Sequence, residues 1–445
     1  VVRLLCQQAY EDASFERAAD LILMFAKTEE AGERNNSVVG SMKHLFSLYL
    51  SGTEATPIRR QAYVARLFSS SNVRHNEIAA ELFHSAFEAS HWTSFSTFDF
   101  GARTRSSGWR PSTIGEKLDW YSGFIDIVAQ ALSGNDQQKI ALAKKIISSH
   151  FRGLWTFAGC FDALEAIVKE HAQSGAWPDL WISIKNVIFF DGERHAPELL
   201  DRLLALEKQA APNDPYSEME AYALSSTWDH AEVKGGKHSE AVQSVNEKLI
   251  KLGELACTDP TYIEKLGERL WEKHIDALWV FGRGLARGSQ DQESTFEFLV
   301  NSAEQASFAR VNPVLLAGFI QEVQSGDPLL ARKLLEASLD HPKFREHFVY
   351  LLCAASFEPW AVKKLIELAR DGALEAWTFT HLSFGRVHEA IGDDDLAELL
   401  DALLVLPNGI SAVLQILEMR FFIEKDSSYR PSEIILSTGR RAIKN

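Results

Sequence analysis

Histidine and cysteine are the residue types in this sequence best suited to hold a metal ion or supply a nucleophile. The chain has 14 histidines and four cysteines, which are Cys6, Cys160, Cys257 and Cys353. No two cysteines form a C-x-x-C pair, no H-E-x-x-H pattern occurs, and His341 and His347 have a spacing that fits no zinc motif. We therefore expect no metal ion, no bound cofactor and no catalytic residue in this chain.

Two glycine-rich strings resemble nucleotide-binding loops without matching them. The string 235–238, GGKH, lacks the upstream Gly of a P-loop and the hydroxyl after Lys that would hold Mg²⁺. The string 282–288, GRGLARG, misses G-x-G-x-x-G by one residue and follows a predicted helix, whereas a dinucleotide site follows a strand. We expect the first string to be a turn. The glycines of the second are expected to let two helices pack closely.

The longest irregular stretch is the segment 91–113, HWTSFSTFDFGARTRSSGWRPST. A loop of this length inside a compact domain is usually functional or disordered, and five aromatic residues argue against disorder. Aromatic residues and arginine are the types that dominate protein interfaces. The segment therefore predicts a partner-binding loop, with contacts from Trp92, Phe95, Phe98, Arg103, Arg105, Trp109 and Arg110.

Two alternatives for this loop stay open. In the first, its aromatic residues pack between neighbouring helices and its arginines pair with carboxylates of the same chain. In the second, the loop contacts nucleic acid. The chain has 46 basic and 61 acidic residues among 445, a net charge of −15, which makes nucleic-acid binding an unfavoured interpretation.

The cellular setting follows from what the sequence lacks. No run of 18 apolar residues occurs, so no transmembrane helix and no membrane partner are expected. Scattered cysteines without disulfide spacing favour the reducing cytoplasm. The chain begins Val1-Val2-Arg3 without Met, inside an apolar helical pattern. This start predicts that the sequence is part of a longer helical protein.

Apolar residues recur at the spacing of amphipathic helices almost from end to end. The pattern predicts helices over most of the chain, among them 38–51, 57–69, 115–132, 178–190 and 260–287. The counts of 26 Gly and 13 Pro are low enough for long helices. The short segments 181–184 and 187–190 also fit a strand, because periodicity alone does not separate a strand from a buried helix.

A weak internal repeat appears in the last third. The segments 326–335, 357–366 and 392–400 are similar, with the first two 31 residues apart. Such a spacing is typical of a two-helix unit in a solenoid, in which stacking buries faces that one helix pair cannot bury alone. The sequence thus predicts an all-α fold, an elongated α-solenoid of degenerate TPR- or HEAT-like helix pairs. We expect three continuous segments, 1–114, 115–290 and 291–445.

Several stretches together resemble the C-terminal helical-repeat arm of bacterial STAND NTPases of the antiviral AVAST class. The stretches that carry the resemblance are 35–63, 98–103, 108–111, 120–121, 278–286 and 310–319. In that family the arm recognises a phage protein, such as the large terminase subunit or the portal. An upstream P-loop NTPase, with ATP and Mg²⁺, then oligomerises and activates an effector.

The resemblance implies that this chain is the ligand-sensing arm alone, and it supplies no catalytic residue. Its expected partner is a phage packaging or structural protein. Two other functions stay open. One is a general helical scaffold in a host complex. The other is an α-helical enzyme with a site assembled from distant residues, which would need a deep polar pocket holding two ionisable groups of shifted pKa.

Overall fold

The structure, a computed structural model, is predominantly helical in its described part. It describes residues 1–29, 37–93, 98–172, 177–232, 238–355, 357–385, 387–422 and 432–444. Within these ranges no β-strand occurs, and the backbone of Phe100 and Arg103 forms an isolated antiparallel bridge. The predicted all-α fold is confirmed, and the segments 181–184 and 187–190 lie in a helix instead of a strand.

The chain forms two compact units, Val1–Ser217 and Glu218–Asn445. Their boundary falls inside the expected central segment 115–290, and neither 114/115 nor 290/291 separates the units. The division into three segments stays a prediction. None of the helices in the described ranges is long and apolar enough to cross a lipid bilayer.

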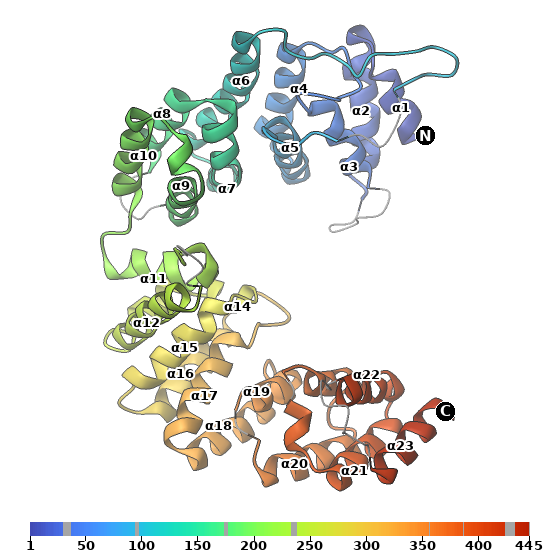
Figure 1. The fold of residues 1–445 in the computed structure, drawn as a ribbon, viewed down its shortest axis with the longest axis vertical. Helices are drawn as coiled ribbons and strands as arrows, with labels where there is room; N and C mark the ends of the chain where they lie inside the picture. The colour runs from blue at the N-terminus through green and yellow to red at the C-terminus, as the bar shows by residue number, and fades with distance from the viewer. Residues whose placement is uncertain are drawn as a thin grey trace. The chain divides into compact units, whose positions relative to one another are not determined.

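The first unit stacks its helices in two layers (Figure 1). In one layer, each helix contacts the next in the order α4, α6, α8 and α10. In the other layer the order is α3, α5, α7 and α9. The α-helices are α1 (Val2–Gln8), α2 (Phe15–Ala26), α3 (Val38–Lys43), α4 (Pro57–Ser69), α5 (Val73–Ala86), α6 (Ile114–Leu132), α7 (Gln137–Gly153), α8 (Phe161–His171), α9 (Pro178–Asp191) and α10 (Pro197–Ala210). Short 3-10 turns are η1 (Asp12–Ser14), η2 (His44–Phe46) and η4 (Gly192–Arg194), and η3 (Leu154–Ala158) is a π-helical turn.

The second unit also has two layers. In the first, α12, α15, α17, α19, η7 and α22 contact one another in turn, and the second holds α16 with α18 and α20 with α21 and α23. The bounds are α11 (Pro215–Ala223), α12 (His238–Ala256), α13 (Thr261–Leu266), α14 (Arg269–Glu272), α15 (Asp276–Gly288), α16 (Gln292–Glu304), α17 (Val314–Gly326), α18 (Pro328–Asp340), α19 (Phe348–Ala354), α20 (Pro359–Arg370), α21 (Asp393–Leu404), α22 (Gly409–Phe422) and α23 (Glu433–Lys444). Shorter 3-10 segments are η5 (Thr227–Asp229), η6 (Arg345–His347), η7 (Ala376–Ser383) and η8 (Val387–Ala390).

The internal repeat marks one layer of this second unit. Its three copies begin α18, α20 and α21, and each is followed in the chain by a helix of the other layer, which is α19, η7 or α22. This alternation is compatible with an α-solenoid. The TPR- or HEAT-like type of the repeat stays a prediction.

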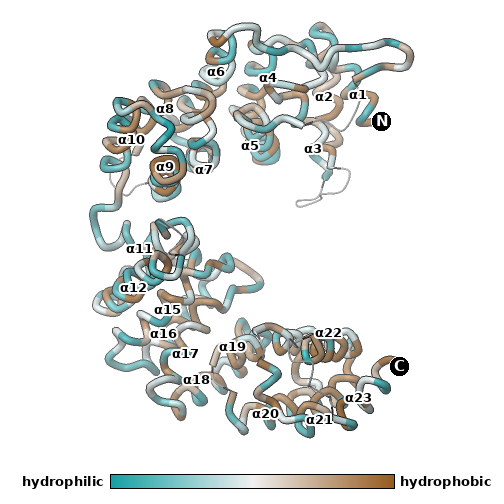
Figure 2. The backbone as a smooth tube through the Cα atoms, viewed as in Figure 1, coloured by the Kyte–Doolittle hydropathy of each residue, from teal (hydrophilic) through white to brown (hydrophobic). Residues whose placement is uncertain are grey.

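Local chemistry sets where many of these helices start. Pro57, Pro328 and Pro359 occupy the first turns of α4, α18 and α20, where a missing N–H costs no hydrogen bond. Asp136 and Asp327 accept hydrogen bonds from the first backbone N–H groups of α7 and α18. Apolar residues recur along most helices, as the brown stretches of α17 and α22 indicate in Figure 2.

Two of the predicted helices are shorter than expected. The predicted helix 38–51 ends at Phe46, because Ser47 is extended and Leu50 has a positive φ of 57°. The predicted helix 260–287 divides into α13, α14 and α15. Gly267, with a φ of 57°, ends α13, and an extended Lys273 ends α14.

Glycines bring α12, α15 and α17 into backbone contact, as the string 282–288 predicted. A Cβ atom at Gly282 would collide with the carbonyl oxygen of Leu315, and one at Gly318 with that of Trp279. A Cβ at Gly284 would likewise meet the backbone of Ile250 in α12. The interpretation of this string as a helix-packing element is therefore confirmed.

We expect Gly318→Ala to lower the free energy of unfolding of the second unit by about 1–3 kcal/mol, because the added methyl forces α15 and α17 apart. Urea unfolding of the full chain, followed by circular dichroism, measures the change. Gly326→Ala in the same helix is the matched control, since a Cβ there meets no atom within 4 Å. Equal stability of Gly318→Ala and the parent chain would contradict close packing.

Candidate partner-binding sites

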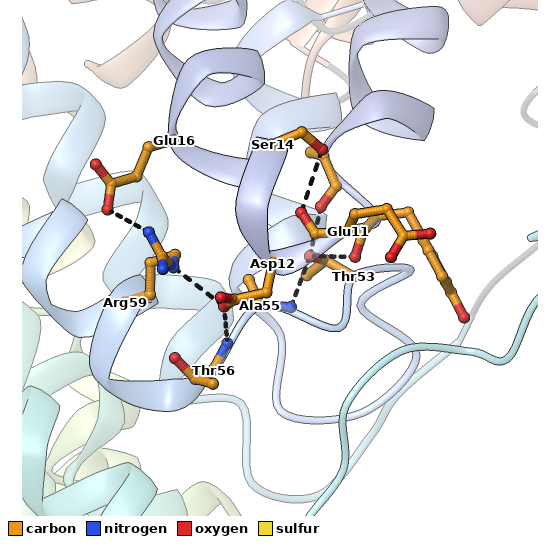
Figure 3. A network of polar contacts seen from close by, with 10 residues as sticks. Glu11, Asp12, Ser14, Glu16, Thr53, Ala55, Thr56 and Arg59 are labelled. Atoms are coloured by element: carbon orange, nitrogen blue, oxygen red, sulfur yellow. Dashed lines mark hydrogen bonds and ion pairs between the residues drawn. The ribbon is translucent and has the colours of Figure 1, made fainter.

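The short segment 50–56 anchors the irregular loop of the first unit. Its Thr53 is fully buried and donates from Oγ1 to the carbonyl oxygen of Ala9 at the end of α1. Asp12 accepts hydrogen bonds from the Thr56 N–H and the Arg59 Nε, both at 3.0 Å (Figure 3). The hydrogen bond from the Thr56 N–H is the main reason why the pKa of Asp12 is lowered. These contacts join the end of α1, the turn η1 and the start of α4 into one platform.

The loop after Phe98 lies on this platform. The Gly52 N–H donates to the carbonyl oxygen of Ser107 at 2.9 Å, and the Trp109 N–H donates to that of Thr53 at 2.8 Å. Between them, Gly108 has a φ of 95°, and a Cβ there would lie 2.6 Å from backbone atoms of Thr53. Only glycine fits this approach without strain. The loop is therefore attached to the helices by its backbone.

Trp109, one of the predicted contact residues, is part of this attachment. Its ring stacks on Trp120 of α6 with centroids 6.0 Å apart and an interplanar angle of 20°. The buried guanidinium of Arg60 lies over both rings, at 5.5 Å from Trp109 and 4.3 Å from Trp120. Burial lowers the pKa of Arg60 to about 9, so the group is still cationic at neutral pH. The cation and the two rings stabilise one another.

Arg105 is also engaged within the chain. Its guanidinium lies 4.4 Å from the ring centroid of Tyr10 and 4.7 Å from that of Phe100, and its Nη1 donates to the Gln7 carbonyl oxygen at 2.8 Å. Arg105 and Trp109 therefore pack on their own chain, as the first alternative predicted. That alternative expected Arg105 to pair with a carboxylate, but Arg105 contacts two aromatic rings and a backbone carbonyl oxygen.

The other predicted residues divide into exposed and half-buried positions. Arg103 and Arg110 are exposed, and no side-chain hydrogen bond or ion pair joins them to another described residue. Phe98 is half-buried against Gly52. Trp92 is half-buried against Tyr49, while Phe95 lies outside the described residues. The partner-binding role of all seven stays a prediction, and the structure leaves Arg103 and Arg110 most accessible.

A second candidate site, which the sequence did not reveal, lies in the second unit. A cavity of about 320 Å³ opens between α15, α19 and η7. Its walls include Trp279, Tyr350, Cys353, His381 and Phe384. Phe384 is 64% exposed, although a phenylalanine is normally buried. We call this cavity the α15–η7 pocket.

The ionisable groups in the α15–η7 pocket are held neutral. Burial lowers the pKa of His381 and raises that of Tyr350, and it raises the pKa of the Cys353 thiol to about 12. At neutral pH all three side chains are therefore uncharged. The Trp279 Nε1 donates to Gln321 at 2.9 Å. These features suit an apolar side chain better than an ion, and the enzymatic alternative stays a hypothesis.

The histidines considered for metal binding are dispersed. Within the described ranges, no group of three His, Cys, Asp or Glu residues has the arrangement needed to hold a metal ion. His84 and His150 meet between α5 and α7, with Nδ1 and Nε2 2.6 Å apart, and burial lowers the pKa of His150 to about 4. His388 is fully buried, and its Nδ1 lies 3.1 Å from the Leu382 carbonyl oxygen.

Comparison with known protein families and with curated proteins finds no match to this chain. The fold is therefore what describes this chain. It has two units, and each unit stacks its helices in two layers. The resemblance to the STAND sensor arm stays a prediction from the sequence.

Detaching the loop from its platform should make it accessible to protease. We expect Gly108→Ala to increase the rate of trypsin cleavage after Arg103 and Arg105, because the methyl collides with Thr53. Mass spectrometry of timed digests identifies the cut sites. Gly115→Ala serves as the control, since a Cβ there makes an ordinary contact at 3.7 Å. Unchanged cleavage in Gly108→Ala would contradict the attachment.

Stability measurements separate the attached side chains from the accessible ones. Trp109→Ala should lower the free energy of unfolding by about 2–4 kcal/mol, because the stack over Arg60 and Trp120 is lost. Arg103→Ala and Arg110→Ala should each change it by less than about 0.5 kcal/mol, as surface substitutions do. Thermal and urea unfolding of the three variants test this contrast. A large loss in Arg103→Ala would place that side chain in the packing.

Proposed function

We propose that this chain is a recognition module that binds a protein partner at the α15–η7 pocket. The observation that carries the proposal is the exposed Phe384 beside an open cavity lined by Trp279, Tyr350 and His381. Contiguous aromatic residues next to a pocket are characteristic of binding hot spots. The residues come from three helical segments of one layer, α15, α19 and η7. Binding through one layer of stacked helices is common in helical-repeat proteins that bind macromolecules.

The chemistry of the pocket defines what part of the partner enters it. Its neutral Tyr350, Cys353 and His381 have no charge to offer an ionic group at neutral pH. An apolar or aromatic side chain would displace water from these walls at a gain of about 25 cal/mol per Å² buried. The partner therefore anchors itself with one such side chain, and its polar backbone lies on the surrounding helices.

The partner itself is proposed from the sequence resemblance. We propose that the chain is the ligand-sensing arm of a larger STAND ATPase and binds a phage protein such as the large terminase subunit or the portal. In this proposal ATP, Mg²⁺ and the effector act in other domains of that ATPase. A helical scaffold for a host complex would use the same pocket, so purified phage proteins decide between the two functions.

The pocket proposal predicts a specific loss of binding. We expect Phe384→Asp to weaken the binding of a purified phage terminase or portal at least tenfold, because a carboxylate replaces the apolar rim. Biolayer interferometry with the immobilised full chain measures this change. Val405→Asp is the control, since Val405 is 85% exposed and does not line the pocket. If terminases and portals from several phages do not bind the parent chain, the sensor-arm proposal is wrong.

If a partner binds equally well to Phe384→Asp and to the parent chain, the chain recognises proteins through another surface. In that case the accessible Arg103 and Arg110 of the first unit are the next residues to reverse in charge. Circular dichroism of each variant establishes that a loss of binding does not reflect unfolding.

A further inference from the structure

The first unit contains a cavity of about 560 Å³ beside the start of its irregular loop. The segment 89–92 forms one part of its lining. The rest comes from Tyr49, the first turn of α6 and the π-helical turn η3. The residues that give it chemical character are Tyr49, His91, Trp92, Lys117 and Phe157. We call it the Lys117 cavity.

Aromatic rings form the walls of the Lys117 cavity. Tyr49 and Trp92 meet edge to face, with centroids 4.7 Å apart and an interplanar angle of 73°. Phe157 is 41% exposed and lines the same cavity. An aromatic ring placed here would have the edges and faces of three rings as neighbours, an arrangement that stabilises a flat apolar group.

A hydrogen-bond donor also lies along this cavity. Lys117 donates from Nζ to the Phe157 carbonyl oxygen at 2.8 Å. An ammonium group has three N–H donors, so a single carbonyl leaves capacity for a ligand. The exposed imidazole of His91 also lines the cavity.

The backbone of η3 helps to position the ammonium group of Lys117. A π-helical turn is rare and occurs often at functional sites. Here it ends at Gly159, which has a φ of 80°, and the Phe157 carbonyl oxygen within the turn accepts from Lys117. The nearby carboxylate of Glu88 does not line the cavity. Partial burial would raise the pKa of Glu88, but hydrogen bonds from Ser90 and His91 outweigh it and lower that pKa.

We propose that the Lys117 cavity binds a small aromatic carboxylate. The ring of the ligand lies against Tyr49, Trp92 and Phe157, and its carboxylate accepts a hydrogen bond from Lys117 Nζ. Of the described residues that line the cavity, none is acidic. This site is separate from the α15–η7 pocket and does not depend on the proposed protein partner.

The probe for this site is 3-phenylpropanoate, tested on the full chain by saturation-transfer NMR and isothermal titration calorimetry. A ligand of this size is expected to bind with a Kd of the order of 1 mM. We expect Lys117→Met to weaken binding at least tenfold and Lys117→Arg to retain most of it. Trp92→Leu should also weaken binding, because it removes one of the three rings that line the cavity.

Lys139→Met is the matched control, because Lys139 also donates from Nζ to a backbone carbonyl oxygen, that of Ser69 at 3.0 Å, and does not line the cavity. It should bind the probe as the parent chain does. The uncharged 3-phenylpropanamide should bind at least tenfold more weakly than the carboxylate. Three results would overturn the proposal: no binding by the parent chain up to about 10 mM, equal binding by Lys117→Met, or equal binding of the amide.

Discussion

The need to cover wide apolar helix faces shapes both units of this chain. α17 has an unbroken buried run from Val314 to Ile320, so no single neighbour can shield it. It contacts α15, α16, α18 and α19, and the glycines of α15 and α17 let two of these backbones touch. Each helix that covers one neighbour brings a further apolar face of its own. Layers of stacked pairs follow from this requirement.

Both candidate binding cavities occur where this regular stacking is interrupted. In the second unit, the 3-10 segment η7 takes the place of an α-helix, and it is followed by Phe384 and by Gly385 with a φ of 64°. In the first unit, the π-helical turn η3 lies between α7 and α8. Tighter or wider turns than those of an α-helix change the spacing to neighbouring helices. The space that results exposes aromatic rings that would otherwise be buried.

The sequence predicted those features that depend on residues close together in the chain. Apolar periodicity located most helices, proline located three helix starts, and the string 282–288 indicated helix packing. The turn at Gly267 was missed because the apolar pattern continues on both sides of it. The sequence offered packing on the same chain as an alternative for Arg105 and Trp109, but it did not identify their partners. Tyr10, Thr53 and Arg60 lie about 50 to 100 positions earlier in the chain. No periodic pattern records such a distant contact.

The α15–η7 pocket escaped sequence analysis for the same reason. Trp279, Tyr350 and His381 come from three different helices, and none of them stands out from its local sequence. Only the order of helices in the stack brings them together. The loop segment 91–113, in contrast, was visible as an irregular stretch, although two of its prominent side chains proved to be packing residues.

The attachment of the loop to segment 50–56 has a consequence for how the first unit is made. During synthesis, α1 and α4 leave the ribosome well before Trp109. Tyr10, Thr53 and Arg60 can therefore make their contacts with the loop only after the loop has been synthesised. Contacts between residues so far apart in sequence close late, because the chain between them must first be ordered. The early helices are therefore without the contacts of Arg105 and Trp109 until residues 98–110 have been synthesised.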